Sequence, residues 1–553
     1  MARKYFLSFS LFFFLITAWG QKLKKEDRQL MSNLQAHIAF LSSDALEGRR
    51  TGTEGERLAA EYISSAFKGI GLLPKGTAAY YQAFEISEGA QVNTATHLVI
   101  NEQNLVLHKD FFPLSYSASA SLEAMPALAL HEEGMPWFIN LKDVLEDNKN
   151  NPHYDVAEGL KTKASELKAK GATAVIVYNT SSIDDGLAFN GKEAAQPINL
   201  PVIYITKEAA KKYLSDETAT FDIKLKTDIG PKVRKGMNVI GYLDNGAATT
   251  VVLGAHFDHL GRGEDGNSML RDVKQIHNGA DDNASGTAAV IELARLLKAS
   301  KSKQNNYLFI AFSGEELGLY GSKYFVENPT IDLTKVNYMI NMDMVGRLND
   351  SSKTITVGGY GTSPVWGEAY SAKGKNSLYA TNLLFKYDSS GTGPSDHTSF
   401  YRKDIPVLFY FTGLHSDYHK PTDDFDKINY TGQVNIVKHI MSVVEQTNKR
   451  TAKLAFTKTR EVQMGTSARF SVTMGIMPDY TFSGAGVRAD GISDNRPAQK
   501  AGLKTGDIIT ALNQYKVTSV ESYMQALSKF KKGDKATVTY TRERKTFSAT
   551  VEF

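Results

Sequence analysis

Three short apolar runs between positions 251 and 342 each end in acidic or imidazole side chains. The runs cover residues 251–253, 307–312 and 336–340, and they are rich in β-branched and aromatic residues. Such runs are typical of strands buried in a parallel sheet, which carries its functional groups at the carboxyl ends of the strands. We therefore expect an α/β fold with a mixed, mostly parallel sheet flanked by helices.

The polar residues that follow these runs form a candidate metal site. They are His256, Asp258, Asp281, Asp282, Glu315, Glu316 and Asp343. Six carboxylates brought together would repel one another strongly unless cations lay between them. Imidazole and carboxylate groups suit zinc, and manganese or cobalt can occupy oxygen-rich sites. The chain contains no cysteine, so thiolate ligands and cysteine nucleophiles are excluded.

Most of these signals have a plainer explanation when they are taken one at a time. Two residues apart on a strand, His256 and Asp258 merely share a face. The pair Asp281-Asp282 could cap a helix, and the pair at 315–316 could form a solvated turn. Asp343 is harder to explain in this way, because apolar residues flank it and an unpaired buried charge is costly.

Taken together, the residues favour two metal ions. Two dications about 3.5–4 Å apart can activate water, and one of two adjacent glutamates can bind metal while its neighbour acts as general base. A second imidazole ligand is still needed, and the candidates are His259, His397, His415 and His419. Of these, His419 precedes the segment KPTDDF in an apparent loop just past a strand.

Six segments in the same order resemble the co-catalytic zinc aminopeptidases, a family that also holds glutamate carboxypeptidases and glutaminyl cyclases. The segments are GAHFDH, GADDNASGTAAVIELAR, FSGEELGLYGS, NMDMVG, SDHTSF and YHKPTDD. The resemblance implies that two zinc ions are bound by His256, Asp281, Glu316, Asp343 and His419.

The resemblance also implies a role for the residues around the ions. Asp281 would bridge both ions, with a cis peptide bond between Asp281 and Asp282. Glu315 would be the general base. Asp258 would hold the imidazole of His256, and Tyr418 would donate to the oxyanion.

The first twenty residues have the pattern of a signal peptide. A basic start precedes an apolar stretch, and small residues precede a cleavage point near Gly20/Gln21. We expect a secreted or periplasmic protein with no membrane association after cleavage. Lysine and arginine exceed aspartate and glutamate by 64 − 60 = 4, and this small excess argues against nucleic acid as a partner.

The chain is long enough for several domains. We expect the main domain in two parts, residues 21–93 and 233–452, with helices over 56–68 and 433–448. The β-rich insert at 94–232 resembles a protease-associated domain, and the tail at 457–553 resembles a PDZ domain. That tail would either bind peptide ends or dock on the catalytic domain, although Pro478 in its expected carboxylate loop removes a backbone donor.

The leading functional hypothesis is an exported aminopeptidase that acts on peptides or proteins. A carboxypeptidase or dipeptidase of the same family is the first alternative. A glutaminyl cyclase, which uses one zinc, and a non-catalytic peptide-binding protein are weaker alternatives, because Glu315 and five ligand positions are all present.

Overall fold

The computed structural model describes most of the chain after the expected signal peptide. The described residues are 24–149, 151, 154–191, 198–216, 218–270, 274–371, 383–459, 472–478, 485–492, 496–518 and 520–553. Residues 1–20, and with them the predicted cleavage point, lie outside this set. Among the described residues, no helix is both long enough and apolar enough to cross a membrane.

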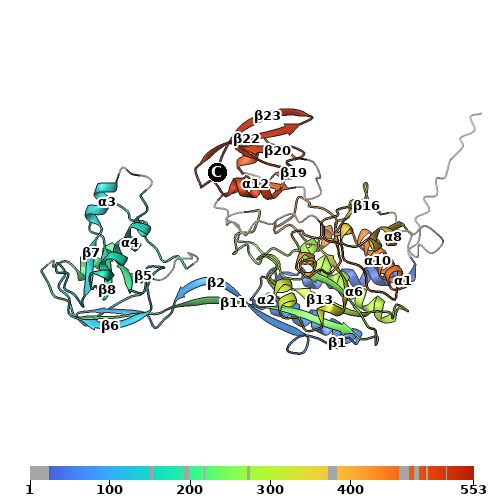
Figure 1. Ribbon diagram of the computed structural model, residues 1–553, viewed down its shortest axis with the longest axis horizontal. Coiled ribbons are helices and arrows are strands. Elements are labelled where there is room, and N and C mark those ends of the chain that lie inside the picture. Colours follow the sequence, from blue (N-terminus) through green and yellow to red (C-terminus); the bar gives the residue numbers. More distant parts are fainter. Residues whose placement is uncertain are drawn as a thin grey trace, which may run out of the picture. The chain divides into compact units, whose positions relative to one another are not determined.

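Contacts divide the chain into two compact units. The insert is Glu85–Lys235, and the other unit joins the chain up to Phe84 to Gly236–Phe553. Within this second unit we describe separately a main domain, which ends near residue 459, and a tail domain, which begins at residue 472 (Figure 1).

A mixed sheet forms the centre of the main domain. Its strands lie in the order β1-β11-β13-β12-β14-β17-β15-β16, and β2 also pairs with β11. Their bounds are β1 (Leu73–Pro74), β2 (Tyr81–Val92), β11 (Ile229–Leu243), β12 (Thr250–His256), β13 (Asn306–Phe312), β14 (Val336–Met342), β15 (Thr354–Gly358), β16 (Leu384–Tyr387) and β17 (Val407–Phe411). The central neighbours β13, β12, β14 and β17 run parallel, which confirms the expected mostly parallel sheet.

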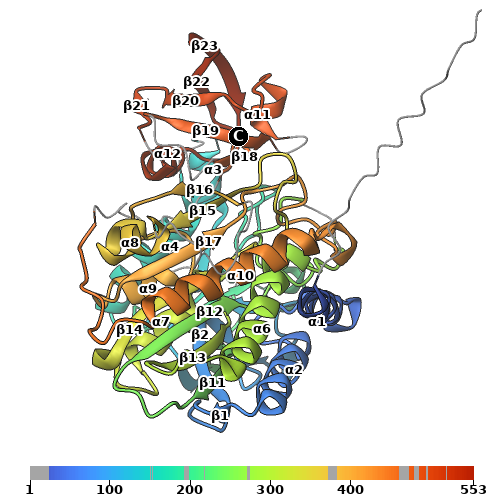
Figure 2. The same ribbon diagram turned by 90° about the vertical axis from the view of Figure 1, so that its right-hand side faces the viewer.

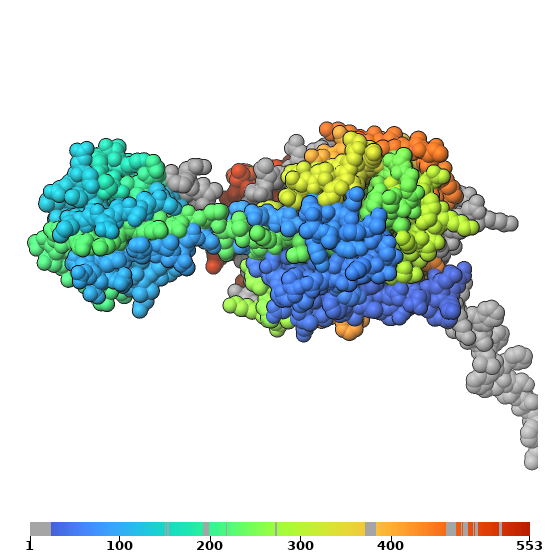
Figure 3. Space-filling view, turned by 90° about the horizontal axis from the view of Figure 1, so that it is seen from below, coloured from blue at the N-terminus to red at the C-terminus, as the bar shows by residue number. Residues whose placement is uncertain are grey.

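Helices cover both faces of this sheet. They are α1 (Lys25–Leu41), α2 (Glu54–Ile70), α6 (Gly286–Ala299), α7 (Tyr320–Glu327), α8 (Val365–Ser371), α9 (His397–Tyr401) and α10 (Tyr430–Thr447). Figure 2 shows α6 and α10 lying across the sheet with α1 and α2 beside them. In the space-filling view, the N-terminal segment in blue packs against the rest of the main domain (Figure 3).

Alternation along each strand separates two hydrophobic cores. On β13, Tyr307 and Phe309 belong to the cluster shared with α1, α2, α6 and α10. The intervening Leu308 and Ile310 belong to the cluster that includes Phe325 of α7. Successive side chains of a strand point to opposite faces. A continuous apolar run is therefore what a strand covered on both sides requires.

The described residues of the insert form two small sheets and three helices. The sheets have the orders β4-β3-β10-β6 and β5-β9-β8-β7. The strands are β3 (His97–Ile100), β4 (Gln103–Leu105), β5 (Phe111–Pro113), β6 (Ala120–Ala124), β7 (Pro136–Asn140), β8 (Ala174–Tyr178), β9 (Val202–Ile205) and β10 (Ile223–Thr227). The helices are α3 (Lys142–Asn148), α4 (Val156–Ala169) and α5 (Lys207–Tyr213).

The described strands of the tail domain form an antiparallel sheet with its own hydrophobic cluster. The described strands are β18 (Ile476–Pro478), β19 (Val487–Ile492), β20 (Ile508–Leu512), β21 (Tyr515–Lys516), β22 (Lys535–Arg542) and β23 (Lys545–Glu552). Its described helices are α11 (Pro497–Lys500) and α12 (Val520–Leu527). The strand β18, which contains Pro478, lies at one end of the strand order.

Candidate metal centre

The four central parallel strands deliver the site residues to one edge of the sheet. β12 ends at His256, Asp343 follows β14, and Glu315 and Glu316 follow β13 by three and four residues. His419 lies in the loop after β17. Because these strands are neighbours, the segments after their carboxyl ends converge.

A first group of ligand atoms gathers around the imidazole of His256. Its Nε2 atom lies 3.3 Å from Oδ1 of Asp343 and 3.4 Å from Oδ1 of Asp282. All three residues are buried or nearly so: their side chains are 1%, 13% and 5% exposed in the order named. Asp343 is held in place by Ser395, whose Oγ donates to Oδ2 of Asp343 at 2.9 Å.

A second group gathers around the imidazole of His419. Its Nε2 atom lies 3.2 Å from Oδ2 of Asp282 and 3.2 Å from Oε2 of Glu316. The other ring nitrogen, Nδ1, is 2.9 Å from the backbone oxygen of Asn267. Nδ1 donates a hydrogen bond to this oxygen, because a carbonyl oxygen only accepts, and Nε2 is the ring atom that would face an ion.

These spacings are those of ligands that share an ion. Two atoms that each lie about 2.0–2.2 Å from a tetrahedral ion are about 3.3–3.6 Å from one another. The four separations around His256 and His419 are 3.2–3.4 Å. Asp282 contributes one oxygen to each group, so its carboxylate lies between the two imidazoles and could bridge a pair of ions.

The structure corrects the expectation for Asp281. Its carboxylate turns away from both groups, because Oδ1 accepts the backbone N–H of Gly346 at 2.6 Å and Oδ2 lies 3.2 Å from Nε2 of His415. The backbone at Asp282 is extended, with φ −103° and ψ 94°. The two carboxylates therefore have different partners, and only that of Asp282 lies near the imidazoles of both His256 and His419. The cis peptide bond also lies one residue later than expected, between Asp282 and Asn283.

The other candidate imidazoles are not equivalent. Nδ1 of His259 is 2.8 Å from Oε1 of Glu316, which is a hydrogen-bond length and shorter than the spacing of two ligands on one ion. His259 is also close enough to Asp282 and Glu316 to share an ion with them. Its Nδ1, however, is 4.0 Å from Oδ2 of Asp282, farther than Nε2 of His419, so we assign it the role of orienting the carboxylate of Glu316. His397 stacks on Phe409, with ring centroids 4.4 Å apart. Burial lowers the pKa of His397 to about 3, so it stays neutral.

Glu315 lies beside the first group without sharing its spacing. One of its carboxylate oxygens is 4.0 Å from Nε2 of His256, and its side chain is 10% exposed. Burial raises the pKa of Glu315 well above its usual value, and the nearby carboxylates of Asp343 and Asp396 add to this effect. By contrast, the imidazoles of His419 and His259 outweigh burial and hold the pKa of Glu316 well below its usual value.

Asp258 and Tyr418 border the site in different ways. The carboxylate of Asp258 is 3.7 Å from Nδ1 of His256, whereas the backbone oxygen of Asp258 is closer, at 3.2 Å. The same carboxylate accepts Thr51 Oγ1 at 3.0 Å and the backbone N–H of Glu315 at 3.3 Å. The ring of Tyr418 stacks on that of His419 with centroids 3.9 Å apart.

Two residues that support the site were missed by the sequence analysis. The guanidinium of Arg49, which is fully buried, donates to the backbone oxygens of Leu41, Phe257, Asn278 and Gly279. It therefore fixes the loops that carry His256 and Asp282. The only available signal was an arginine among the small residues of GRRTG.

Asp423 is the second missed residue. Its Oδ2 atom accepts the backbone N–H groups of Asp281 and Asp282, both at 3.0 Å. It lies four residues after His419, so it ties the loop of one candidate ligand to the loop of another. Burial and the charge of Asp281 raise the pKa of Asp423 to about 6.

The donor set fits zinc. Imidazole nitrogens and carboxylate oxygens, in two buried groups of three that share one carboxylate, are zinc ligands at ligand-to-ligand distances. A buried glutamate at the edge of such a group is the arrangement used by metal-dependent hydrolases. The fold and the site thus define a metal-dependent hydrolase.

Comparison with known proteins identifies the family. Residues 238–444 match peptidase family M28, residues 144–213 match the PA domain, and residues 462–553 match the PDZ domain. The chain therefore contains a domain of peptidase family M28 together with a PA domain and a PDZ domain. These matches confirm the expected resemblances to a protease-associated domain and a PDZ domain.

Individual relatives are aminopeptidases by name. Aminopeptidase YwaD of Bacillus subtilis (strain 168) is 26% identical over 433 residues, which cover 74% of this chain and 84% of that protein. An aminopeptidase of Pseudomonas aeruginosa is 28% identical over 258 residues, which cover 45% of each chain. Among solved structures, an aminopeptidase from Aneurinibacillus sp. strain AM-1 matches 78% of this chain and 97% of its own, with 22% identity and a TM-score of 0.41.

Proposed function

We propose that this protein is a zinc-dependent aminopeptidase whose site holds two ions. One ion would be bound by His256, Asp282 and Asp343, and the other by Asp282, Glu316 and His419. The observation that best supports this assignment is the set of four ligand-to-ligand distances of 3.2–3.4 Å that meet at Asp282. The aminopeptidase names of the relatives support the choice of substrate.

When bound, the two ions would supply Lewis acidity that makes a water molecule acidic near neutral pH and polarises the peptide carbonyl. The residues of the chain would do the rest. Glu315 accepts the proton of the attacking water and then delivers it to the departing amine, for which its nearly buried position at the edge of the first group and its raised pKa suit it. The hydroxyl of Tyr418 donates a hydrogen bond to the oxygen of the peptide carbonyl, which gains negative charge during the reaction.

Asp258 would position both the imidazole of His256 and the general base. Its carboxylate accepts the backbone N–H of Glu315 at 3.3 Å, and its backbone oxygen lies 3.2 Å from Nδ1 of His256. The free ammonium group of a peptide would be attracted to this acidic region, which accounts for action at the amino end of a chain.

A substrate panel tests the proposed activity. Aminoacyl p-nitroanilides should be cleaved, and the same substrates with an acetylated amine should not, because a blocked amine carries no positive charge. A metal chelator should abolish cleavage, and added zinc should restore it. Cleavage of blocked substrates alone would instead support a different peptidase activity for this fold.

The Glu315→Gln variant tests the general base. It should keep its metal content and lose about 10²–10⁴-fold in kcat. Glu327→Gln removes an exposed carboxylate at the end of α7 and serves as the matched control. Glu315 is not the base if the Glu315→Gln variant turns over within a few-fold of the wild type.

We also propose that the protein is exported and that its tail either binds peptide ends or docks on the peptidase. Export is supported by the apolar segment that precedes Gly20, and one relative, 27% identical, is a probable lipoprotein aminopeptidase of Mycobacterium tuberculosis. Sequencing the amino terminus of the mature protein tests the cleavage point. Calorimetry with C-terminal peptides tests the tail, and an absence of heat at millimolar peptide would favour docking.

A further inference from the structure

A pocket opens beside the metal centre, between the loop after β14 and the loop after β17. Its volume is about 370 Å³, and its lining includes Arg347, Asp350, His415, Lys427 and Asn429. Arg347 lies four residues after Asp343, and His415 lies four residues before His419. Four residues span at most about 14 Å, so the pocket is within reach of a substrate held at the metal centre.

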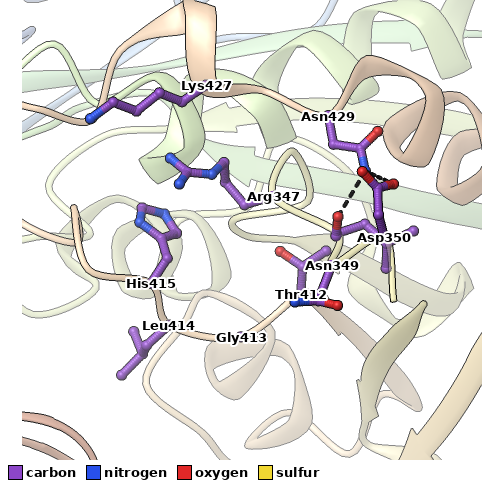
Figure 4. Close-up of a pocket in the computed structure, with 10 residues that line it drawn as sticks. Arg347, Asn349, Asp350, Thr412, Gly413, Leu414, His415, Lys427 and Asn429 are labelled. Atoms are coloured by element: carbon purple, nitrogen blue, oxygen red, sulfur yellow. Dashed lines mark hydrogen bonds between the residues drawn. The ribbon is translucent and has the colours of Figure 1, made fainter. Parts of the chain in front are cut away.

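Cationic and imidazole groups gather on one side of this pocket. Figure 4 shows the guanidinium of Arg347 between the side chains of Lys427 and His415. Asp417 holds the two cations in place, since its carboxylate lies 3.2 Å from Nη2 of Arg347 and 2.8 Å from Nζ of Lys427. Two fixed cations therefore share a single carboxylate, which leaves an excess positive charge on this side.

The opposite side is already satisfied by internal contacts. Asn429 Nδ2 donates to Oδ1 of Asp350 at 2.8 Å and to the backbone oxygen of Leu348 at 2.8 Å. On the cationic side, in contrast, Nη1 of Arg347 is buried and has no hydrogen-bond partner among the residues that the structure describes. An unpaired buried donor costs about 1–3 kcal/mol, and a carboxylate is the acceptor that a guanidinium fork fits best.

We propose that this pocket binds a carboxylate of the peptide substrate, with Arg347 and Lys427 as its counter-charges. The proposal rests on the aminopeptidase function proposed above and adds a substrate class to it. Two parts of a peptide carry this chemistry. They are the side chain of an acidic amino-terminal residue and the C-terminal carboxylate of a short peptide.

Matched substrate pairs separate these sources. Glutamyl and glutaminyl p-nitroanilide have the same shape and differ in one charge, as do Leu-Gly and Leu-Gly-amide. If the acidic side chain enters the pocket, kcat/KM for the glutamyl substrate should exceed that for the glutaminyl substrate by about tenfold or more. If the C-terminal carboxylate enters, Leu-Gly should exceed its amide by a similar factor.

Three variants test which residues are responsible. In Arg347→Gln, the ratio of kcat/KM between the charged substrate and its amide, in the pair that shows a preference, should fall to about one. In Lys427→Met the same ratio should also fall. Lys403→Gln, which removes an exposed cation from the turn after α9, should leave the ratio unchanged. Each ratio is measured on one preparation, so partial misfolding of a variant cancels. A wild-type ratio near one for both pairs, or a ratio that Arg347→Gln leaves intact, would overturn the proposal.

The two proposals fail in different ways. If leucyl p-nitroanilide is cleaved but neither pair shows a preference, the carboxylate pocket is wrong and the aminopeptidase stands. If no substrate with a free amine is cleaved, the proposed aminopeptidase activity is wrong, and a binding measurement then tests the carboxylate pocket by itself. In that case calorimetry on the full chain should show L-glutamate binding more tightly than L-glutamine, or Leu-Gly binding more tightly than Leu-Gly-amide, with the difference lost in Arg347→Gln; equal binding within both pairs would end the proposal.

Discussion

Exchanging one carboxylate for an amide at each of two adjacent positions distinguishes the bridging residue from its neighbour. Asp282→Asn and Asp281→Asn change the side chain by the same atoms, one residue apart. Asp282 supplies Oδ1 to the group around His256 and Oδ2 to the group around His419, at 3.4 and 3.2 Å from the ring nitrogens. Replacing Asp282 should therefore weaken the binding of both ions, whereas Asp281 contacts neither the imidazole of His256 nor that of His419.

The magnitudes follow from these contacts. Removing a residue that only orients a metal ligand lowers metal affinity by about 10–100-fold, and loss of a shared ligand should exceed that for each ion. A hundredfold loss equals about 2.8 kcal/mol per ion. Asp281→Asn keeps an oxygen that can accept the N–H of Gly346, so it should lower the free energy of unfolding by only about 1–2 kcal/mol and leave the metal content near that of the wild type.

Metal content is measured by atomic emission after dialysis against a chelator that buffers free zinc. Wild type and Asp281→Asn should retain about two zinc ions per chain, and Asp282→Asn should retain less than half of that. The reverse result, with Asp281→Asn stripped of zinc and Asp282→Asn fully loaded, would refute the assignment. Thermal unfolding of both variants shows whether any metal loss merely reflects a loss of fold.

Two further substitutions test the support of the site. Glu292 of α6 accepts hydrogen bonds from Asn33 of α1 at 3.1 Å and from Arg295 at 2.6 Å. Burial raises the pKa of Glu292, but these partners together with His37 outweigh it and lower the pKa below 4.5. Glu292→Gln should therefore lower the free energy of unfolding by about 2 kcal/mol at pH 7. Because the pKa of Glu292 is lower in the folded state, the difference in stability from wild type should be complete above pH 4.5 and shrink as the pH falls below it. Urea denaturation across that pH range measures the difference. A difference that stays constant with pH would contradict the charge argument. Arg49→Met should lower the free energy of unfolding by about 3–5 kcal/mol, because four backbone oxygens lose their donor. Arg49→Lys should not restore this stability, because a single ammonium group lacks the fork geometry of a guanidinium. If urea denaturation places Arg49→Lys near the wild type, the positive charge alone is sufficient.

The fold of the main domain could be predicted because its strands carry their own signal. The runs at 251–253, 307–312 and 336–340 became β12, β13 and β14, since only strands covered on both faces need continuous apolar sequence. The helix expected at 56–68 is α2 (Glu54–Ile70), which ends where Gly71 takes a positive φ of 82°.

Most residues that meet at the candidate site could be named from the sequence, but a shift of one residue decides which of two adjacent carboxylates is among them. In Asp281-Asp282 the residue type, charge and neighbours are nearly identical, so sequence carries almost no information about which carboxylate faces inward. The turn of the backbone decides this, and it depends on partners distant in sequence, namely Gly346 and Asp423. The roles of Arg49 and of the pocket at Arg347 were hidden for the same reason, because both arise from loops that only the fold brings together.

The route by which the chain enters and leaves its insert has a consequence for shortening the molecule. The outgoing strand β2 and the returning strand β11 pair with one another, so the boundary residues Phe84 and Gly236 belong to neighbouring strands. Joining two such strands by a tight turn closes a short loop, and short flexible loops cost little entropy to close. A chain shortened by the 151 residues of the insert would thus keep the same sheet and the strands that carry the site residues.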